Sequence, residues 1–394
     1  MRASLKTPNA GLGAAPPPSG PGGSGGPAPP VPVISRSALL SSVSPEAKLA
    51  SALPPRFLAY RELWRRAEAG ETQPFPLHLD LDITTRCNLS CPICPAGNPA
   101  RSLFPGMGLD LSLSLAERAL AEAAAGGLYS LRIGVTGEPL LRGECPDLIA
   151  SARAQGILDL ALITNGLLLT EKTARALIRA GLTRLMVSVD AGSAESYRAA
   201  RPGGDFALVL KNIRAFLALR QELSGPLPLL RVSFVETRLN EGDKELFIAT
   251  FAPLADYLSI QKYAPLTRGD DFAPEAFAPK AGATPEPQGP RRCPEPMTRL
   301  ALHADGALFP CCSDFGRLRP LGRYPEISLK EAFNSPRAAF LREPRAGDGA
   351  GADCADCLRR LSAAFPAPRA FGERDGALQS PLDGPPDGPL AGPT

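Results

Sequence analysis

The sequence predicts an α/β fold built on a parallel sheet. In its middle part, strand patterns alternate with helix patterns six times in a row, and the strands are almost continuously apolar, as in sheets covered on both faces. The expected strands are Leu77–Thr84, Ser130–Thr136, Asp159–Thr164, Arg184–Val189, Leu229–Glu236 and Tyr257–Lys262. The expected helices are Leu115–Ala125, Pro146–Gln155, Glu171–Ala180, Phe206–Leu223 and Asp243–Phe251. Such a sheet is either open or closed into a barrel, and in both forms active sites lie at the carboxyl ends of the strands.

Length and composition exclude several classes of protein. At 394 residues the chain is long enough for two or three domains of roughly 150 residues each. A net charge of +3 gives no strong field, so we expect neither a nucleic-acid partner nor a membrane surface, and no apolar run reaches the roughly 18 residues of a membrane span. Nine cysteines without a visible secretory leader indicate a reducing, cytoplasmic compartment. The chain has only two histidines, so few residues are available for acid–base catalysis by histidine.

Composition also divides the chain. Residues 1–36 and 363–394 are rich in Pro, Gly and Ala, and we expect disorder there. Residues 37–76 are a short helical lead-in, on which Phe57, Tyr60 and Trp64 share one face that we expect to dock on the main domain. The core spans residues 77–263, a linker or long loop spans 264–292, and a second unit spans 293–362. In that unit Asp305-Gly306 predicts a hairpin turn, and Ser328 with Glu331 predicts a capping box that opens a helix through about Leu341.

The loop after the first strand carries three cysteines, Cys87, Cys91 and Cys94, at the spacing C-x3-C-x2-C. Thiolates are the protein ligands of iron–sulfur clusters, and a four-iron cube normally takes four of them. Three ligands therefore leave one iron open, which is typical of a catalytic metal site. A zinc site and a disulfide are the alternatives, but a nearby fourth ligand and an even cysteine count are both lacking.

Polar side chains follow other strands. Gly137 and Glu138 come after the second strand, where glycine allows close backbone approach and the carboxylate can accept from an amino group. Ser188 and Asp190 close the fourth strand, where an acid can bind a ribose hydroxyl or cap a helix. A plain turn is the alternative at Gly137, and Asn165-Gly166 after the third strand is an ordinary turn dipeptide.

Taken in order on their strands, the three motifs resemble the radical S-adenosylmethionine (radical SAM) enzyme superfamily over residues 77–262. The resemblance implies a partial (β/α)6 TIM-type barrel with a [4Fe-4S] cluster on Cys87, Cys91 and Cys94. In that family the open iron binds the amino and carboxylate groups of S-adenosylmethionine. Reductive cleavage of the cofactor then gives a 5′-deoxyadenosyl radical, which takes hydrogen from the substrate. By the same resemblance, Gly137 and Glu138 hold the methionine amino group, and Ser188 and Asp190 hold the ribose.

Three residues are less certain matches to the family. The residue before the third cysteine is usually aromatic and packs on adenine, whereas here it is Ile93, so altered geometry with retained binding is expected. Arg201 is placed either at the cofactor carboxylate or on the surface at a helix end. Cys145, after the second strand, is either a small buried thiol or a hydrogen-atom donor to a substrate radical.

The second unit holds the remaining cysteines, with Cys293 and Cys311 flanking the hairpin and Cys354 and Cys357 as a later pair. Two pairs of thiols form a closed site for an iron–sulfur cluster or for zinc. The spacing from Cys293 through Gly306 to Cys311 resembles the auxiliary-cluster domain called SPASM, or twitch in its shortened form. Since no cysteine follows Cys357, one auxiliary [4Fe-4S] cluster is expected, with Cys312 as the competitor of Cys311.

The expected function is hydrogen abstraction from a peptide or a sugar-like small molecule, with an electron donor such as flavodoxin or ferredoxin. The auxiliary cluster would help the oxidation or bind the substrate. Two alternatives stay open on the residues alone: a non-catalytic iron–sulfur protein for electron transfer or redox sensing, and a zinc-stabilised binding module.

Overall fold

The computed structural model describes residues 38–41, 43–94, 107–263, 277, 293–312 and 320–343. The chain divides into Met1–Pro30 and Val31–Thr394, and every described residue belongs to the second unit. Both predicted disordered tails lie outside the described residues, as does the 264–292 segment apart from residue 277.

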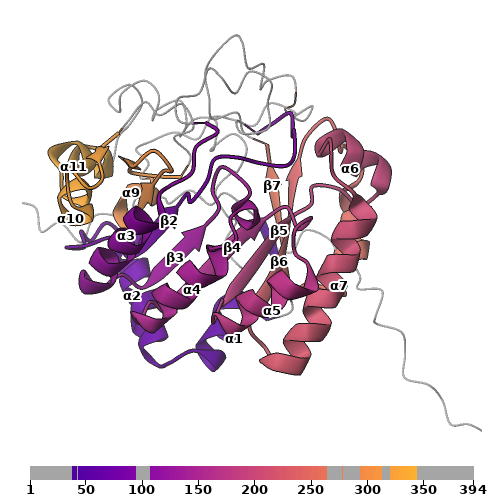
Figure 1. Cartoon of the computed structure of the whole chain (residues 1–394), viewed down its shortest axis with the longest axis horizontal. Helices are drawn as coiled ribbons and strands as arrows, with labels where there is room; N and C mark the ends of the chain where they lie inside the picture. Colours follow the sequence, from indigo (N-terminus) through magenta and orange to yellow (C-terminus); the bar gives the residue numbers. More distant parts are fainter. Residues whose placement is uncertain are drawn as a thin grey trace, which may run out of the picture. The chain divides into compact units, whose positions relative to one another are not determined.

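Six parallel strands form the centre of the fold (Figure 1). They are β2 (His78–Leu81), β3 (Ser130–Ile133), β4 (Asp159–Thr164), β5 (Arg184–Ser188), β6 (Leu229–Glu236) and β7 (Tyr257–Lys262). Each pairs in parallel with the next along the chain, so the sheet runs in chain order. A doubly wound sheet would reverse its order at one point, whereas a (β/α) barrel does not. The predicted partial (β/α)6 barrel is confirmed.

Helices cover the outer face of this sheet, as Figure 1 shows for α3, α4, α5 and α7. Their bounds are α3 Leu113–Ala125, α4 Cys145–Ala154, α5 Glu171–Arg179, α6 Ala194–Ala200, α7 Phe206–Leu223 and α8 Lys244–Phe251. Several begin at side-chain caps: Ser112, Thr170 and Asp205 each accept a hydrogen bond from the first turn of α3, α5 and α7. The helix α6 was not predicted as a separate element.

The outer core follows from strand alternation. Leu79 and Leu81 on β2 and Leu131 and Ile133 on β3 are fully buried against the helices. The residues between them, such as Asp80 and Arg132, face the opposite way, into the barrel. The inner face therefore carries polar side chains as well as apolar ones such as Ala161 and Met186.

The lead-in closes the bottom of the barrel. Its two helices, α1 (Pro45–Ala52) and α2 (Arg56–Glu68), bury Phe57 and Tyr60 in a cluster with Leu77, Leu229 and Tyr257, which start three of the strands or come just before them. Tyr60 stacks on Tyr129 with ring centroids 5.3 Å apart and meets Trp64 edge-on at 5.9 Å. The predicted docking of the aromatic face is confirmed.

The part of the chain that begins at residue 293 continues the barrel sheet. Its first strand, β8 (Arg299–Leu302), pairs in parallel with β2. The sequence had suggested a separate domain here, but this strand pairing joins the region directly to the barrel. The predicted hairpin is present, with β9 (Ala307–Phe309) antiparallel to β8 and Gly306 at a φ of 85°. The outermost strand on this side is β10 (Gly322–Arg323), and β1 (Ala38–Leu40) covers β7 at the other edge.

Three short helices pack around this hairpin: α9 (Glu295–Thr298), α10 (Leu329–Phe333) and α11 (Pro336–Arg342). The capping box of Ser328 and Glu331 is present at the start of α10. The single helix expected to run to about Leu341 is instead two, because Ser335 caps a new helix with Pro336 in its first turn.

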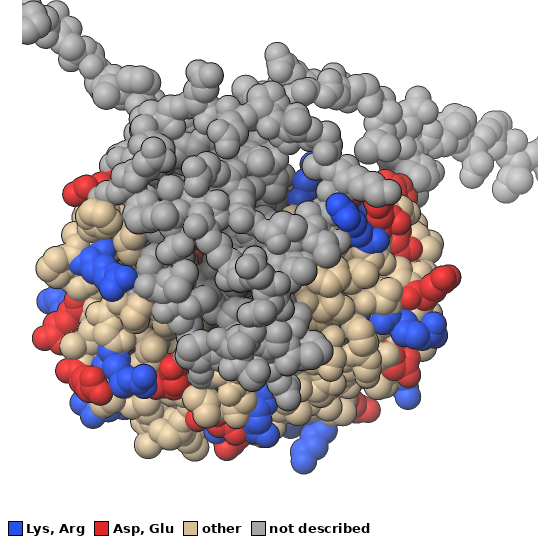
Figure 2. Space-filling view, turned by 90° about the horizontal axis from the view of Figure 1, so that it is seen from above, with Lys and Arg blue, Asp and Glu red and all other residues tan. Residues whose placement is uncertain are grey.

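Charges of both signs are interspersed over the described part of the face in Figure 2. Within the described residues, no helix has the length and apolar character needed to cross a lipid bilayer.

Candidate functional site at the carboxyl ends of the strands

The three-cysteine loop lies where β2 ends, at the carboxyl edge of the sheet. Its start is fixed by Asp110, which accepts hydrogen bonds from Thr84 Oγ1 (2.6 Å) and from Arg86 through both of its carboxylate oxygens (3.0 and 2.6 Å). Its middle is held by a hydrogen bond from the Ser90 backbone N–H to Pro202 O at 3.2 Å. Segments that follow β3, β4 and β5 contact it, and together they contribute Gly137, Glu138, Asn165, Asp190 and Arg201.

Gly137 brings the loop after β3 against the cysteine loop. A Cβ at this position would lie 2.5 Å from Thr84 O and 2.6 Å from Arg86 O, distances that only a glycine avoids. The next residue, Glu138, donates its backbone N–H to Arg86 O at 2.8 Å. Gly137 therefore has a packing role here, which sets the position of Glu138.

The Glu138 carboxylate is buried and held by three donors. One oxygen accepts from Thr164 Oγ1 (2.8 Å) and from the Leu140 N–H (3.0 Å), and the other accepts from the Asn165 N–H (2.7 Å). Burial raises the pKa of this carboxyl, while the three hydrogen bonds oppose that shift. Glu138 is therefore a fixed acceptor under the cysteine loop.

Asn165 is a site residue that the sequence analysis took for an ordinary turn. Its Nδ2 donates to Asn88 Oδ1 at 2.7 Å and contacts Cys87 Sγ at 4.0 Å, so it joins the end of β4 to the cysteine loop. Its position after a parallel strand, at the same edge as Glu138, was the signal that could have identified it.

Arg201 lies in the site and not on the surface. It follows α6, and its Nη2 pairs with Asp190 Oδ2 at 2.5 Å while Nη1 contacts Cys91 Sγ at 4.0 Å. Its buried Nε has no hydrogen-bond partner among the described residues. Burial alone would lower the pKa of Arg201, but the Asp190 and Cys91 charges raise it above its ordinary value, so the guanidinium is a permanent cation.

Asp190 is held in an unusual backbone conformation, with a φ of 58°. Its Oδ1 accepts from the Val235 N–H, and its carbonyl accepts from Asn240 Nδ2, both at 2.8 Å. Asn240 was missed by sequence analysis because it lies in a loop with no regular pattern. The neighbouring Ser188 hydroxyl is partly exposed and makes no hydrogen bond to another described residue.

The three thiols influence one another. Burial raises the pKa of Cys91 to about 12, with Cys94 and Cys87 adding to the shift and Arg201 opposing it. Burial also raises the pKa of Cys87. Without a metal, Cys87 and Cys91 are therefore thiols at neutral pH, because burial disfavours the charged form.

Ile93 is partly exposed between Pro92 and Cys94, so its side chain can still make apolar contact. In the described part of the chain, no three His, Cys, Asp or Glu side chains meet around a single metal ion. The ligands of a four-iron cube bind different irons and do not need to meet in this way.

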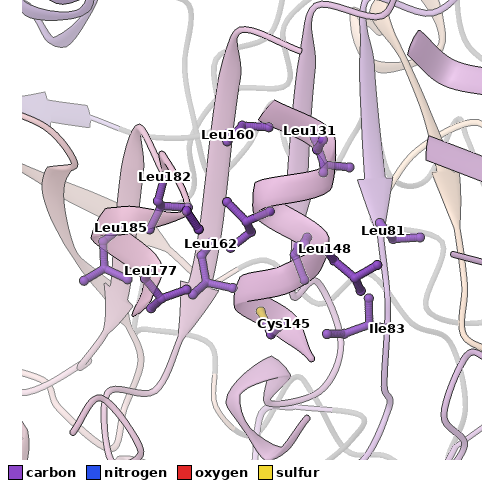
Figure 3. Packing of buried hydrophobic residues seen from close by; sticks show 14 of the residues in the cluster. Leu81, Ile83, Leu131, Cys145, Leu148, Leu160, Leu162, Leu177, Leu182 and Leu185 are labelled. Atoms are coloured by element: carbon purple, nitrogen blue, oxygen red, sulfur yellow. The ribbon is translucent and has the colours of Figure 1, made fainter. Parts of the chain in front are cut away.

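Cys145 lies away from this loop, in the apolar core on the helix side of the sheet. Figure 3 shows its sulfur among Leu81, Ile83, Leu148 and Leu162. The residue is fully buried, and burial raises the pKa of its thiol above the ordinary range. This location favours a small core residue and gives no support to a hydrogen-atom donor.

The second set of cysteines is described in part. Cys293 precedes α9, and the hairpin brings Cys311 and Cys312 back toward the same helix, where Cys312 Sγ lies 3.9 Å from Glu295 Oε2. The predicted approach of the two ends of the hairpin is therefore present. Cys354 and Cys357 lie outside the described residues.

Comparison with known families agrees with this geometry. Residues 81–232 match the profile of the radical SAM superfamily, and residues 293–358 match SPASM, an iron–sulfur cluster-binding domain. A GTP 3′,8-cyclase of Alkaliphilus metalliredigens is 35% identical over 144 residues, which cover 36% of this chain and 43% of that protein. One of Geobacter sulfurreducens is 33% identical over 197 residues, covering 50% and 57%. The chain thus spans about half the length of these relatives.

Among solved structures, Streptococcus suis SuiB bound to the precursor peptide SuiA shares the fold, with a TM-score of 0.53. It is 15% identical, and the match covers 79% of this chain and 75% of that one. Together the matches confirm the predicted enzyme class and its cofactor types, a [4Fe-4S] cluster and S-adenosylmethionine. The chain belongs to the radical SAM superfamily and carries a SPASM iron–sulfur cluster-binding domain.

Proposed function

We propose that this chain cleaves S-adenosylmethionine reductively at a cluster on Cys87, Cys91 and Cys94 and uses the product to abstract hydrogen from a peptide or a sugar-like small molecule. The observation that carries the proposal is the set of polar groups that lie against the cysteine loop, with Asn165 at Cys87 and Arg201 at Cys91. Glu138, Asn165 and Arg201 come from the ends of three different strands or the loops that follow them, and each is fixed by hydrogen bonds before any ligand binds.

The residues present fit the cofactor. The free Nε of Arg201, buried beside Cys91, is an unfilled donor for the methionine carboxylate. Glu138 is an acceptor for the methionine amino group, and the unengaged Ser188 hydroxyl is available to the ribose. Asp190 is partly occupied by Arg201 and Val235, so its share in ribose binding uses the remaining lone pairs of its carboxylate. Ile93 would then pack on the adenine.

When bound, the reduced cluster supplies the electron that cleaves the sulfonium of S-adenosylmethionine into methionine and a 5′-deoxyadenosyl radical. The chain's own residues hold the cofactor in place for this step. Arg201 also places a positive charge against Cys91, which stabilises a thiolate there over a thiol.

The auxiliary site is proposed to use Cys293, Cys311, Cys354 and Cys357. Cys312 has a carboxylate neighbour in Glu295, which favours Cys311 as the ligand. A single auxiliary [4Fe-4S] cluster would accept an electron or bind the substrate, and zinc is the alternative that metal analysis would detect. Flavodoxin or ferredoxin is the proposed electron donor, and the reducing cytoplasm is the proposed compartment because unpaired cluster thiols need it.

Two kinds of substrate have support. The curated relatives are cyclases of a nucleotide, a small molecule, and a structure with the same fold holds a precursor peptide. We give the small molecule more weight, because residues 37–76 are used to close the barrel and do not form a separate peptide-binding domain.

The test is anaerobic reconstitution with iron and sulfide, reduction with dithionite, and measurement of 5′-deoxyadenosine. The proposal predicts its formation from S-adenosylmethionine. A reconstituted, reduced protein that holds iron but forms none would favour a non-catalytic electron-transfer or sensing role. One zinc per cysteine set and no iron would favour a binding module.

A further inference from the structure

The inner face of the barrel carries a layer of partly exposed arginines below the site. Arg132 and Arg299 both pair with Asp80, at 2.6 and 3.6 Å, and Arg299 pairs also with Glu295 at 2.9 Å. Further along the sheet, Arg184 Nε on β5 donates to Asp159 Oδ1 on β4 at 2.9 Å. These arginines therefore have carboxylates to balance their charge, which cations largely removed from water require.

Arg231 on β6 has no such partner. Its Nε donates to Ser233 Oγ at 3.0 Å, and among the described residues no carboxylate lies within ion-pairing distance. Burial lowers its pKa to about 10; Tyr257 opposes this shift, and the like charges of Arg132 and Arg184 add to it. At neutral pH it is still a cation, and within the described inner face of the barrel it lacks the carboxylate partner that the other three arginines have.

A buried group without a hydrogen-bond partner in the described chain lies on the adjacent strand. Ser259 on β7 is fully buried, and its hydroxyl has no hydrogen-bond partner among the described residues. Ser233 and Ser259 are paired in register, and both face into the barrel, since the residues flanking them on their strands pack on the helices. A buried hydroxyl without a partner is rare in folded proteins and indicates an absent ligand or water.

We propose that Arg231, with the hydroxyls of Ser233 and Ser259, binds an anionic group of a small-molecule substrate, either a phosphate or a carboxylate. The proposal rests on the function given above and specifies its substrate further. A planar guanidinium with four N–H donors left after its bond to Ser233 fits either oxyanion, and a hydroxyl adds one more donor. The anion would also balance the excess charge of the arginine layer.

The position of Arg231 agrees with this role. The carbonyl of Ser233 accepts hydrogen bonds from the backbone N–H groups of Val189 and Asp190, so Ser233 lies at the level of the site. Arg231 comes two residues earlier on β6, and it is therefore closer to the floor of the barrel. An anion held there would leave the rest of a small molecule between Arg231 and the cysteine loop. The methionine carboxylate has its own partner in Arg201, which makes Arg231 a separate site.

The experiment measures binding of anions to the reconstituted full chain in the presence of saturating S-adenosylmethionine, which fills the cofactor site. Inorganic phosphate and pyrophosphate test whether the bound group is a phosphate, and succinate tests whether it is a carboxylate. We expect one class to bind, and Arg231→Met to weaken it by about tenfold or more, since a hydrogen bond to a charged group is lost. Arg231→Lys keeps the charge, and its affinity for the anion is expected to lie between those of the native chain and Arg231→Met.

Arg175→Met is the matched control, because it also removes one partly exposed arginine, but from α5, where Arg175 pairs with Glu171 of the same helix and with Glu222 of α7. It should leave anion binding unchanged. If Arg231→Met does not fold, modification of arginines in the native chain by phenylglyoxal, mapped by mass spectrometry, replaces it. The bound anion should protect Arg231 from modification by at least several-fold.

Binding that is absent for every probe, or equal in native chain, Arg231→Met and Arg175→Met, would overturn the inference. So would modification of Arg231 that no anion slows. Cleavage of S-adenosylmethionine without substrate is measured on the same samples and should continue in Arg231→Met. If even the native chain forms no 5′-deoxyadenosine, the proposed function fails, and the anion site is judged by the binding data alone.

Discussion

Arg201 links two requirements of the site at the scale of single residues. It pairs with Asp190, which has a left-handed backbone, and it places its charge against Cys91. Asp190 is in turn fixed through its carbonyl by Asn240. Strained backbone held by several hydrogen bonds is common where a fold prepares a binding site before its ligand arrives.

The different environments of the cysteines lead to a first prediction. Cys91→Ala should abolish formation of 5′-deoxyadenosine and the iron–sulfur absorbance of the first cluster, because the proposed cluster would be left with two of its three protein ligands. Cys145→Ala is the matched control, since Cys145 lies in the apolar core. It should retain both properties and lose about 1 kcal/mol of unfolding free energy. Loss of turnover in Cys145→Ala with an intact cluster would show that the thiol acts on substrate.

A second prediction concerns Glu138. Glu138→Gln keeps the size of the side chain but replaces one acceptor by an NH2 group that faces backbone donors. We expect binding of S-adenosylmethionine to weaken by about tenfold or more and stability to fall by about 1–3 kcal/mol. Equilibrium binding and denaturant unfolding measure the two effects. Unchanged affinity in a folded variant would remove Glu138 from the cofactor site.

At the scale of elements, the sequence was sufficient for the barrel. Parallel strands buried on both faces and amphipathic helices leave periodic patterns, so β4, β6, β7 and α7 have the predicted bounds. The strand-end rule also brought Glu138, Asp190 and the cysteine loop to one edge. The sequence could not predict individual side-chain partners, such as Asn240 for the carbonyl of Asp190. A buried polar contact between distant loops leaves no periodic pattern in the sequence.

The inner face of the strands was a further omission. Asp80, Arg132 and Arg231 each interrupt strands that the sequence pattern described as almost continuously apolar, so a polar lining inside the barrel was not predicted. Their pairing depends on the stagger between neighbouring strands, which fixes which inner residues meet. Two further strands, β1 and β8, were also missed as parts of this sheet, because both pair with strands far away along the chain, β1 with β7 and β8 with β2.

The start of β2 gives a third prediction, on pH. His78 is buried between Ser130 and Asp80, and burial lowers its pKa from 6.5 to about 4 even though Asp80 opposes the shift. As the pH falls, the imidazole of His78 is therefore protonated at a higher pH in the unfolded chain than in the folded chain. Stability is complete above about pH 6.5 and declines by about 3 kcal/mol as pH falls to about 4.

Denaturant unfolding at several pH values between 4 and 7 measures this slope. His78→Asn, which does not titrate, should be less stable at pH 7 but should show a shallower decline toward pH 4. Equal slopes in the two proteins would show that His78 does not titrate differently in the folded and unfolded states.

At the scale of the whole molecule, the two matched families share one sheet. β8 pairs along β2, next to the cysteine loop, and Met297 of α9 lies in the cluster that closes the barrel floor. The described part of the SPASM region, from α9 to α11, is therefore a structural part of the barrel. We expect this part and the barrel to unfold together.

This continuity gives a fourth prediction. A chain that ends at Tyr263 loses β8 and should aggregate or lose cooperative unfolding, since the edge of β2 is exposed. A chain that ends at Glu343 keeps β8, β9 and β10 and is the control, expected to unfold cooperatively. A shorter chain that folds and still forms 5′-deoxyadenosine would show that the barrel is independent.

The central claim is that the first cluster has one iron free to bind S-adenosylmethionine. Electron–nuclear double resonance of the reduced, reconstituted protein with 15N- and 17O-labelled methionine groups in the cofactor tests it directly. The account predicts coupling of both labels to the cluster, and its loss in Cys91→Ala. A reduced cluster whose spectrum is the same with and without labelled cofactor would contradict it.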